Sequence, residues 1–103
     1  MKEDLLKIIN HYGVDKQLKY IHSEYFELDE AIVKYETIKE EDEFGYDRMV
    51  FLKEDIAQEI ADCFVMLKQF QYYYDIEDSE IEKIMLEKIQ RQLGRMESDK
   101  ECI

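Results

Sequence analysis

Apolar residues recur at helical spacing along nearly the whole chain, and no proline interrupts them. The 103 residues contain only three glycines, and Tyr, Phe, Ile and Leu recur every turn of a helix rather than in alternation. This period is typical of amphipathic helices, which proline or glycine in the interior would break or weaken. The pattern therefore predicts an all-α fold. The length favours a single domain over residues 1–103, with its core at about 3–97.

Four helices are predicted, as expected for a four-helix bundle. Their approximate ranges are 2–12, 15–40, 51–73 and 80–97. Gly13 is a natural stop for the first helix, and the charged segment KEEDEFGYDRM follows the second helix as the main loop. The third helix is apolar around much of its circumference, which suits a central position. A capping box of Ser79 and Glu82 is expected to open the fourth helix, and the final residues, SDKECI, are expected to form a frayed tail.

Acidic side chains outnumber basic ones by 26 to 14, which gives a formal net charge of −12. A protein that binds duplex nucleic acid normally presents a basic face, so we expect no duplex partner. No run of about 18 apolar residues is present, so no membrane span is expected. The N-terminal segment is too charged for a secretory signal. Cys63 and Cys102 have neither disulfide nor zinc spacing, so a reducing, cytoplasmic setting is expected.

Two pairs of acids stand among apolar neighbours. In the second helix, Glu24 falls in the middle of the apolar face and Glu27 lies one turn away, towards its edge. In the third helix, Glu59 and Asp62 flank an apolar arc in the same way. An unpaired carboxylate in such a place costs on the order of several kcal/mol, so something must compensate for it. If the two helices pack as antiparallel neighbours, the four carboxylates can converge.

A hard divalent cation would relieve the repulsion among converging carboxylates. Four of them cannot all stay ionised in a confined site, and the two motifs contain no basic residue. Oxygen ligands suit magnesium, so the sequence predicts a Mg²⁺ site formed by Glu24, Glu27, Glu59 and Asp62. The competing interpretation is that these are ordinary helix-surface acids. A di-iron bundle is not favoured, because the Glu-x-x-His pairs that it needs are absent.

The segments HYGVDKQLKYIHSEYFELDEAI and EDIAQEIADCFVML resemble the MazG-like nucleotide pyrophosphohydrolases, a family of all-α NTP pyrophosphatases. That family has E-E-x-x-E on one helix and E-x-x-D on the next. Glu24 and Glu27 match the second and third acids of the first motif, and Glu59 and Asp62 match the second motif. The segment KIQRQLGRM resembles the family's last helix, so the resemblance covers about residues 5–96.

The resemblance implies a Mg²⁺-dependent enzyme that cleaves a nucleoside triphosphate between its α- and β-phosphates. The products would be a nucleoside monophosphate and pyrophosphate, and the usual role is to clear surplus or non-standard nucleotides. Carboxylate-held Mg²⁺ orients the phosphates and lowers the pKa of an attacking water, and a spare carboxylate can accept the proton of that water. The resemblance also implies dimers or pairs of dimers, and the apolar third helix predicts a homodimer interface that completes the bundle.

Three departures from the family pattern bear on this prediction. Ser23 replaces the first family Glu, and Tyr20 stands where many members have Lys. The 31 residues between Glu27 and Glu59 exceed the usual family linker, which suggests a longer loop beside the site. The alternative is therefore a noncatalytic helical interaction module derived from the family, which would bind a partner through its acidic face.

The fourth helix provides candidate substrate-binding cations. Lys88 and Arg95 fall within its apolar stripe, and Arg91 lies beside that stripe. Cations on an inward face suit phosphate oxygens. The alternative interpretation is that they pair with the surplus acids of the bundle.

Overall fold

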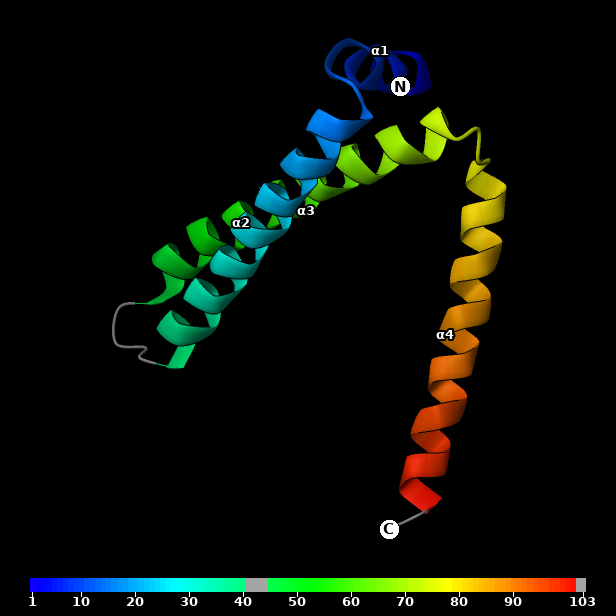
Figure 1. Cartoon of the computed structure of the whole chain (residues 1–103). Helices are drawn as coiled ribbons and strands as arrows, with labels where there is room; N and C mark the ends of the chain where they lie inside the picture. The colour runs from blue at the N-terminus through cyan, green and yellow to red at the C-terminus, as the bar shows by residue number, and fades with distance from the viewer. Residues whose placement is uncertain (41–44, 102–103) are drawn as a thin grey trace. The chain divides into compact units, whose positions relative to one another are not determined.

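The structure, a computed structural model, describes the backbone of residues 1–40 and 45–101 and the side chains of residues 1–39 and 48–99. Within those ranges the chain forms no strand, and its helices are α1 (Lys2–Tyr12), α2 (Val14–Glu40), α3 (Gly45–Tyr73) and α4 (Asp78–Glu101) (Figure 1). The all-α prediction and the number of helices are thus confirmed. Contacts divide the chain into two compact units, Met1–Tyr73 and Tyr74–Ile103. Helices α1 to α3 belong to the first unit, and α4 belongs to the second.

Helix α1 ends where the sequence predicts. Gly13 follows it with a φ of 90°, a conformation that glycine adopts without steric cost. The Gly13 amide donates a hydrogen bond of 2.8 Å to the carbonyl oxygen of Ile9, which satisfies one of the free carbonyls at the helix end. Because α2 begins directly at Val14, this single residue turns the chain from α1 into α2.

Helices α2 and α3 are antiparallel neighbours, and they lie side by side in the blue-to-green part of Figure 1. Their buried and half-buried side chains recur at alternating three- and four-residue steps, the period of helices that pack with a small crossing angle. The inward positions of α2 are Gln17, Ile21, Glu24, Leu28, Ala31, Tyr35 and Ile38. The corresponding positions of α3 are Met49, Leu52, Ile56, Glu59, Cys63, Met66 and Phe70. One acid therefore takes a core position on each helix.

Helix α1 packs against α3 and α2 near the C-terminal end of α3. It buries Leu5 and Ile9, and Ile9 has no exposed surface. Apolar burial of this kind supplies most of the stability of a short helix, because an isolated helix of 11 residues is marginal in water. This end of the first unit is therefore three helices thick, whereas the rest is a two-helix layer.

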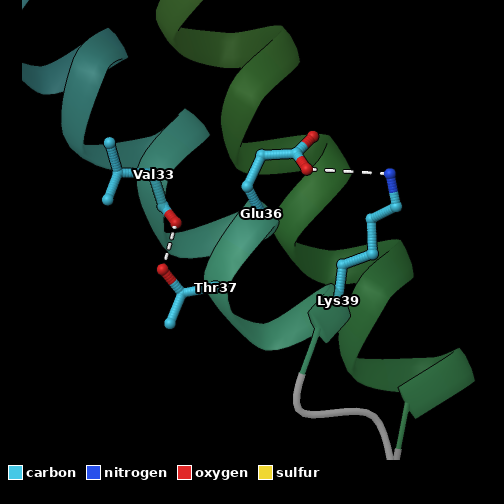
Figure 2. Close-up of polar contacts among 4 residues, drawn as sticks. All are labelled: Val33, Glu36, Thr37 and Lys39. Carbon is cyan, nitrogen blue, oxygen red and sulfur yellow. Dashed lines mark hydrogen bonds and ion pairs between the residues drawn. The ribbon is translucent and has the colours of Figure 1, made fainter.

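Polar contacts at the C-terminal end of α2 are local (Figure 2). The Thr37 hydroxyl donates a hydrogen bond of 2.8 Å to the carbonyl oxygen of Val33, and Lys39 Nζ lies 3.6 Å from Glu36 Oε2. All of these groups are exposed, and a pair at this spacing contributes only about 0.2–0.5 kcal/mol to helix stability. The contacts support the last turns of the helix and involve none of the predicted site residues.

Several predicted boundaries were wrong. Helix α3 begins at Gly45 rather than at about residue 51. Most of the predicted loop is therefore helical, and its residues 41–44 lie outside the described part of the chain. Helix α4 begins at Asp78 and extends to Glu101 rather than to about residue 97, which places Ser79 inside the helix rather than at its cap. Glu, Lys and Arg are good helix formers, so a charged composition alone did not end these helices.

Helix α4 presents an apolar stripe along one side. Its members are the half-buried Ile81 and the exposed Ile84, Met85, Ile89, Leu93 and Met96. Among the described residues, no helix is both long enough and apolar enough to cross a membrane.

Candidate metal centre

Three of the four predicted site acids come together between α2 and α3. One carboxylate oxygen from each of Glu24, Glu27 and Glu59 lies within 4.8 Å of the other two. We call these three residues the acid cluster. Glu24 is buried, with 6% of its surface exposed, whereas Glu59 is half-buried and Glu27 is exposed. The cluster therefore has a closed side at Glu24 and an open side at Glu27.

The helical period explains why these acids meet. Glu24 and Glu59 occupy inward positions of α2 and α3, so antiparallel packing can bring them face to face. Glu27 follows Glu24 by three residues, which places it nearly one turn further along the same side of α2. The sequence-based expectation that the two motifs converge is supported for these three residues.

Asp62, the fourth predicted acid, is exposed and is not one of the three residues whose oxygens share the 4.8 Å group. Its negative charge nevertheless raises the pKa of both Glu24 and Glu59, so it lies close enough to act on them electrostatically. Asp62 is thus placed at the edge of the acid cluster.

Two oxygens of the acid cluster are buried without compensation. Among the described side chains, Glu24 Oε2 and Glu59 Oε2 are the buried oxygens that have no hydrogen-bond partner. The ion pair between Lys39 and Glu36 lies on the exposed end of α2 and involves neither of these oxygens. Buried carboxylate oxygens normally have donors or bind metal ions, so these atoms fit an oxygen-liganded cation.

Burial and the nearby negative charges raise the pKa values of two carboxyl groups in the acid cluster. Burial raises the pKa of Glu24, and the charges of Glu27 and Asp62 raise it further, while the neighbouring Tyr20 side chain opposes the rise. The pKa of Glu59 is raised by burial and then by the charges of Glu27, Asp62 and Glu24. A bound divalent cation would reverse this effect, because positive charge favours the ionised form of each carboxyl group.

Cys63 lies one turn after Glu59 and is buried, with 4% of its surface exposed. Burial and the nearby acids raise the pKa of its thiol. A thiol with a raised pKa stays protonated at neutral pH and is a poor nucleophile. Cys63 is therefore a packing residue beside the acid cluster, as its place in the inward stripe of α3 indicates.

A pocket of about 330 Å³ lies between α1, α2 and α3. We call it the tyrosine pocket, and its lining residues are Ile8, Tyr12, Lys16, Gln17, Tyr20, Val65, Met66 and Gln69. Tyr20 is shared between the pocket and the acid cluster, because its side chain also interacts with Glu24. The pocket is thus connected to the candidate metal centre through one side chain.

Two buried glutamines line the tyrosine pocket. Gln17 Nε2 donates a hydrogen bond of 2.8 Å to Gln69 Oε1, and Gln69 Nε2 donates one of 3.2 Å to the carbonyl oxygen of Val65. The sequence did not lead us to predict this pair. An amide at an inward position on each of two neighbouring helices was the signal that could have revealed the pair.

The predicted substrate-binding cations lie on α4. Lys88 and Arg91 line a shallow pocket with Ile84 and Glu87, and Arg95 is exposed one turn beyond Arg91. These residues belong to the second unit of the chain, so their proposed role at the phosphates stays a prediction.

Comparison with protein-family models, curated proteins and solved structures found no match to this chain.

Proposed function

We propose that this protein is a Mg²⁺-dependent nucleoside triphosphate pyrophosphohydrolase. The observation that carries the proposal is the acid cluster with its two buried carboxylate oxygens that lack hydrogen-bond partners. Such oxygens are costly unless a cation binds them, and the donor set contains only the hard oxygen ligands that Mg²⁺ prefers. The resemblance of both acidic motifs to the MazG-like enzymes selects triphosphate hydrolysis among the reactions that such a centre supports.

Each group of the site has a role in the proposed reaction. Glu24, Glu27 and Glu59 would hold the metal, which supplies charge neutralisation at the phosphates and a more acidic water. Asp62 sits exposed at the edge of the cluster, where it can accept a proton from that water. The tyrosine pocket offers apolar walls and amide groups for the uncharged part of a nucleotide. Lys88, Arg91 and Arg95 are proposed to contact the phosphates.

Pyrophosphate release from a panel of nucleoside triphosphates tests this function directly. We expect release with Mg²⁺ and none with a chelator, because the acids alone would repel the substrate's phosphates. The nucleoside monophosphate should appear in equal amount, which distinguishes cleavage between the α- and β-phosphates from removal of a terminal phosphate. Release of inorganic phosphate alone would contradict the proposed bond cleavage.

Glu59→Gln provides the test at the residue level. The substitution keeps the shape of the side chain but removes one negative ligand, so activity should fall by at least about 100-fold, beyond the usual effect of changing a residue that merely supports a ligand. Circular dichroism should show an unchanged helix content. Glu54→Gln, which removes the same charge from an exposed position on α3, is the matched control and should remain active. Full activity of Glu59→Gln would show that the site is wrongly assigned.

A noncatalytic interaction module remains the second candidate function. Ser23, which replaces an acid of the resembled motif, is exposed beside Glu24 and adds no carboxylate to the cluster. A folded protein that binds Mg²⁺ but hydrolyses no nucleoside triphosphate in the panel would favour this alternative.

A further inference from the structure

The tyrosine pocket contains two amide groups that are almost completely buried. Gln17 and Gln69 both line the pocket, and only 5% and 1% of their surfaces are exposed. Buried amide groups are costly unless their polar atoms find partners, so the partners of these atoms decide what the pocket can bind. The acid cluster includes neither residue.

The hydrogen bonds of Gln69 fix the orientation of both amide groups. The backbone carbonyl of Val65 can only accept a hydrogen bond, so the amide nitrogen of Gln69 is the atom that lies 3.2 Å from it. The same nitrogen lies 3.6 Å from Met66 Sδ, a weak acceptor for its second hydrogen. The oxygen of Gln69 is therefore left to face Gln17, whose amide nitrogen donates to it over 2.8 Å.

Gln17 Oε1 is the acceptor that this arrangement leaves without a donor. Within residues 1–39 and 48–99, no hydrogen bond reaches this oxygen. Turning the Gln17 amide by 180° would place its oxygen against the oxygen of Gln69, so the orientation cannot reverse at low cost. A molecule that fills the pocket and satisfies Gln17 must therefore supply a hydrogen-bond donor.

The walls of the pocket suit a flat aromatic ring. The volume of about 330 Å³ lies at the lower end of the range of about 300–1,000 Å³ for small-molecule pockets, and Ile8, Val65, Tyr12 and Tyr20 provide apolar or aromatic surface. Tyrosine rings can stack on the face of any heterocyclic base. Lys16 also lines the pocket, with Nζ 5.1 Å from the centre of the Tyr12 ring, and its charge suits the anionic part of a nucleotide.

We propose that the tyrosine pocket binds a nucleobase and that Gln17 Oε1 accepts a hydrogen bond from an N–H group on the edge of that base. Gln69 is a positioning residue, because it acts on the base only through Gln17. The inference rests on the proposed function for one point, that the base belongs to a nucleoside triphosphate. It assigns base recognition to the amide pair and leaves the metal to the acid cluster.

Binding of nucleosides, which lack phosphate groups and need no Mg²⁺, tests the inference. Adenosine has an amino group on the edge of its base, and purine riboside is the same nucleoside without that group. Cytidine and zebularine form the corresponding pair for the smaller base. In NMR titrations of the wild type, the amino nucleoside of at least one pair should bind about 10-fold more tightly than its analogue, since the analogue leaves the buried acceptor unpaired. Equal dissociation constants within both pairs, or no binding by any of the four, would overturn the inference.

The double variant Gln17→Leu with Gln69→Leu tests the amide pair itself. It replaces both amides by apolar groups of similar size, so the fold should be kept, as circular dichroism can verify. The preference for the amino nucleoside should disappear, because only the apolar and aromatic walls remain. Gln58→Leu removes an amide from an exposed position on α3 and should keep the preference. A preference that survives in the folded double variant would contradict the role of Gln17.

Pyrophosphate release distinguishes failure of this inference from failure of the proposed function. Release from nucleoside triphosphates, combined with equal binding of the nucleosides within each pair, would show that the activity is right and the base contact is wrong. A preference for the amino nucleoside without any pyrophosphate release would support the base contact and contradict the activity.

Discussion

Glu24 and Glu59 occupy inward positions of the α2–α3 pair, where apolar side chains are expected. Leu28 and Ile21 flank Glu24 at the neighbouring inward positions of α2, so the acid interrupts an otherwise consistent stripe. When a natural protein places a charged side chain at an inward position that should be apolar, the position often belongs to a functional site, where stability is lost in favour of binding or catalysis. The cost should be visible in the stability of the metal-free protein.

We predict that the metal-free protein becomes less stable as the pH rises from about 4.5, the ordinary pKa of these carboxyl groups. The pKa values of Glu24 and Glu59 are raised in the folded state, so above that pH the folded chain retains protons that the unfolded chain has lost. The free energy of unfolding then falls with pH until the raised pKa values are passed. Urea unfolding at a series of pH values measures this slope.

Two comparisons isolate the cluster from the general repulsion of an acidic chain. Glu59→Gln has one titrating group fewer, so its stability should depend less steeply on pH in the same window. Saturating Mg²⁺ should also flatten the slope, because the cation favours the ionised carboxylates of the folded state. Identical slopes in the wild type and Glu59→Gln would contradict the assignment of raised pKa values to this site.

At the scale of helices, α2 and α3 are tied together by the buried pair Gln17 and Gln69. The hydrogen bond joins residues that are 52 positions apart, and Gln69 is 1% exposed. Gln69 also holds its own orientation, because its amide nitrogen donates to the carbonyl oxygen of Val65 in the preceding turn. The pair therefore specifies which turns of the two helices face each other.

We predict that Gln69→Leu lowers the free energy of unfolding by about 1–3 kcal/mol, the usual cost of leaving a buried polar group unpaired. Gln17 would then have no acceptor for its amide group. The double variant Gln17→Leu with Gln69→Leu should recover much of the loss, since both polar groups are then replaced by apolar groups of similar size. Urea unfolding of the wild type, the two single variants Gln17→Leu and Gln69→Leu, and the double variant provides the measurement as a double-mutant cycle. Additive effects on the free energy of unfolding would show that the two amides are not coupled.

The sequence predicts the helices better than it predicts which side of α3 faces inward. The helical period alone identifies four helices, but α3 is apolar on several sides, so its inward face is ambiguous. On α3 the large apolar side chains of Phe64 and Leu67 are exposed, whereas Met66 is buried. The pairing of Gln17 with Gln69 depends on the register between two helices, which no local pattern supplies.

At the scale of the whole molecule, a single chain exposes much apolar surface. Phe51 and Phe64 on α3 are 67% and 61% exposed, and Phe64 lines an apolar pocket with Met1, Leu5, Val65 and Lys68. Contiguous apolar surface of this kind usually marks an interface with a partner. Helix α4, in the second unit, carries an apolar stripe of its own.

We predict that the protein is a homodimer whose interface includes part of α3, because twofold symmetric dimers are the commonest way to cover such a surface. Size-exclusion chromatography with light scattering at micromolar concentration should give a mass of at least twice 12.6 kDa. Phe64→Glu would place a charge in the interface and should shift the protein towards the monomer, whereas Gln58→Glu adds the same charge at an exposed position on α3 without removing apolar surface. If the substrate pockets lie near the subunit boundary, the Phe64→Glu monomer should also lose activity. A folded and fully active wild-type species at 12.6 kDa would show instead that one chain suffices.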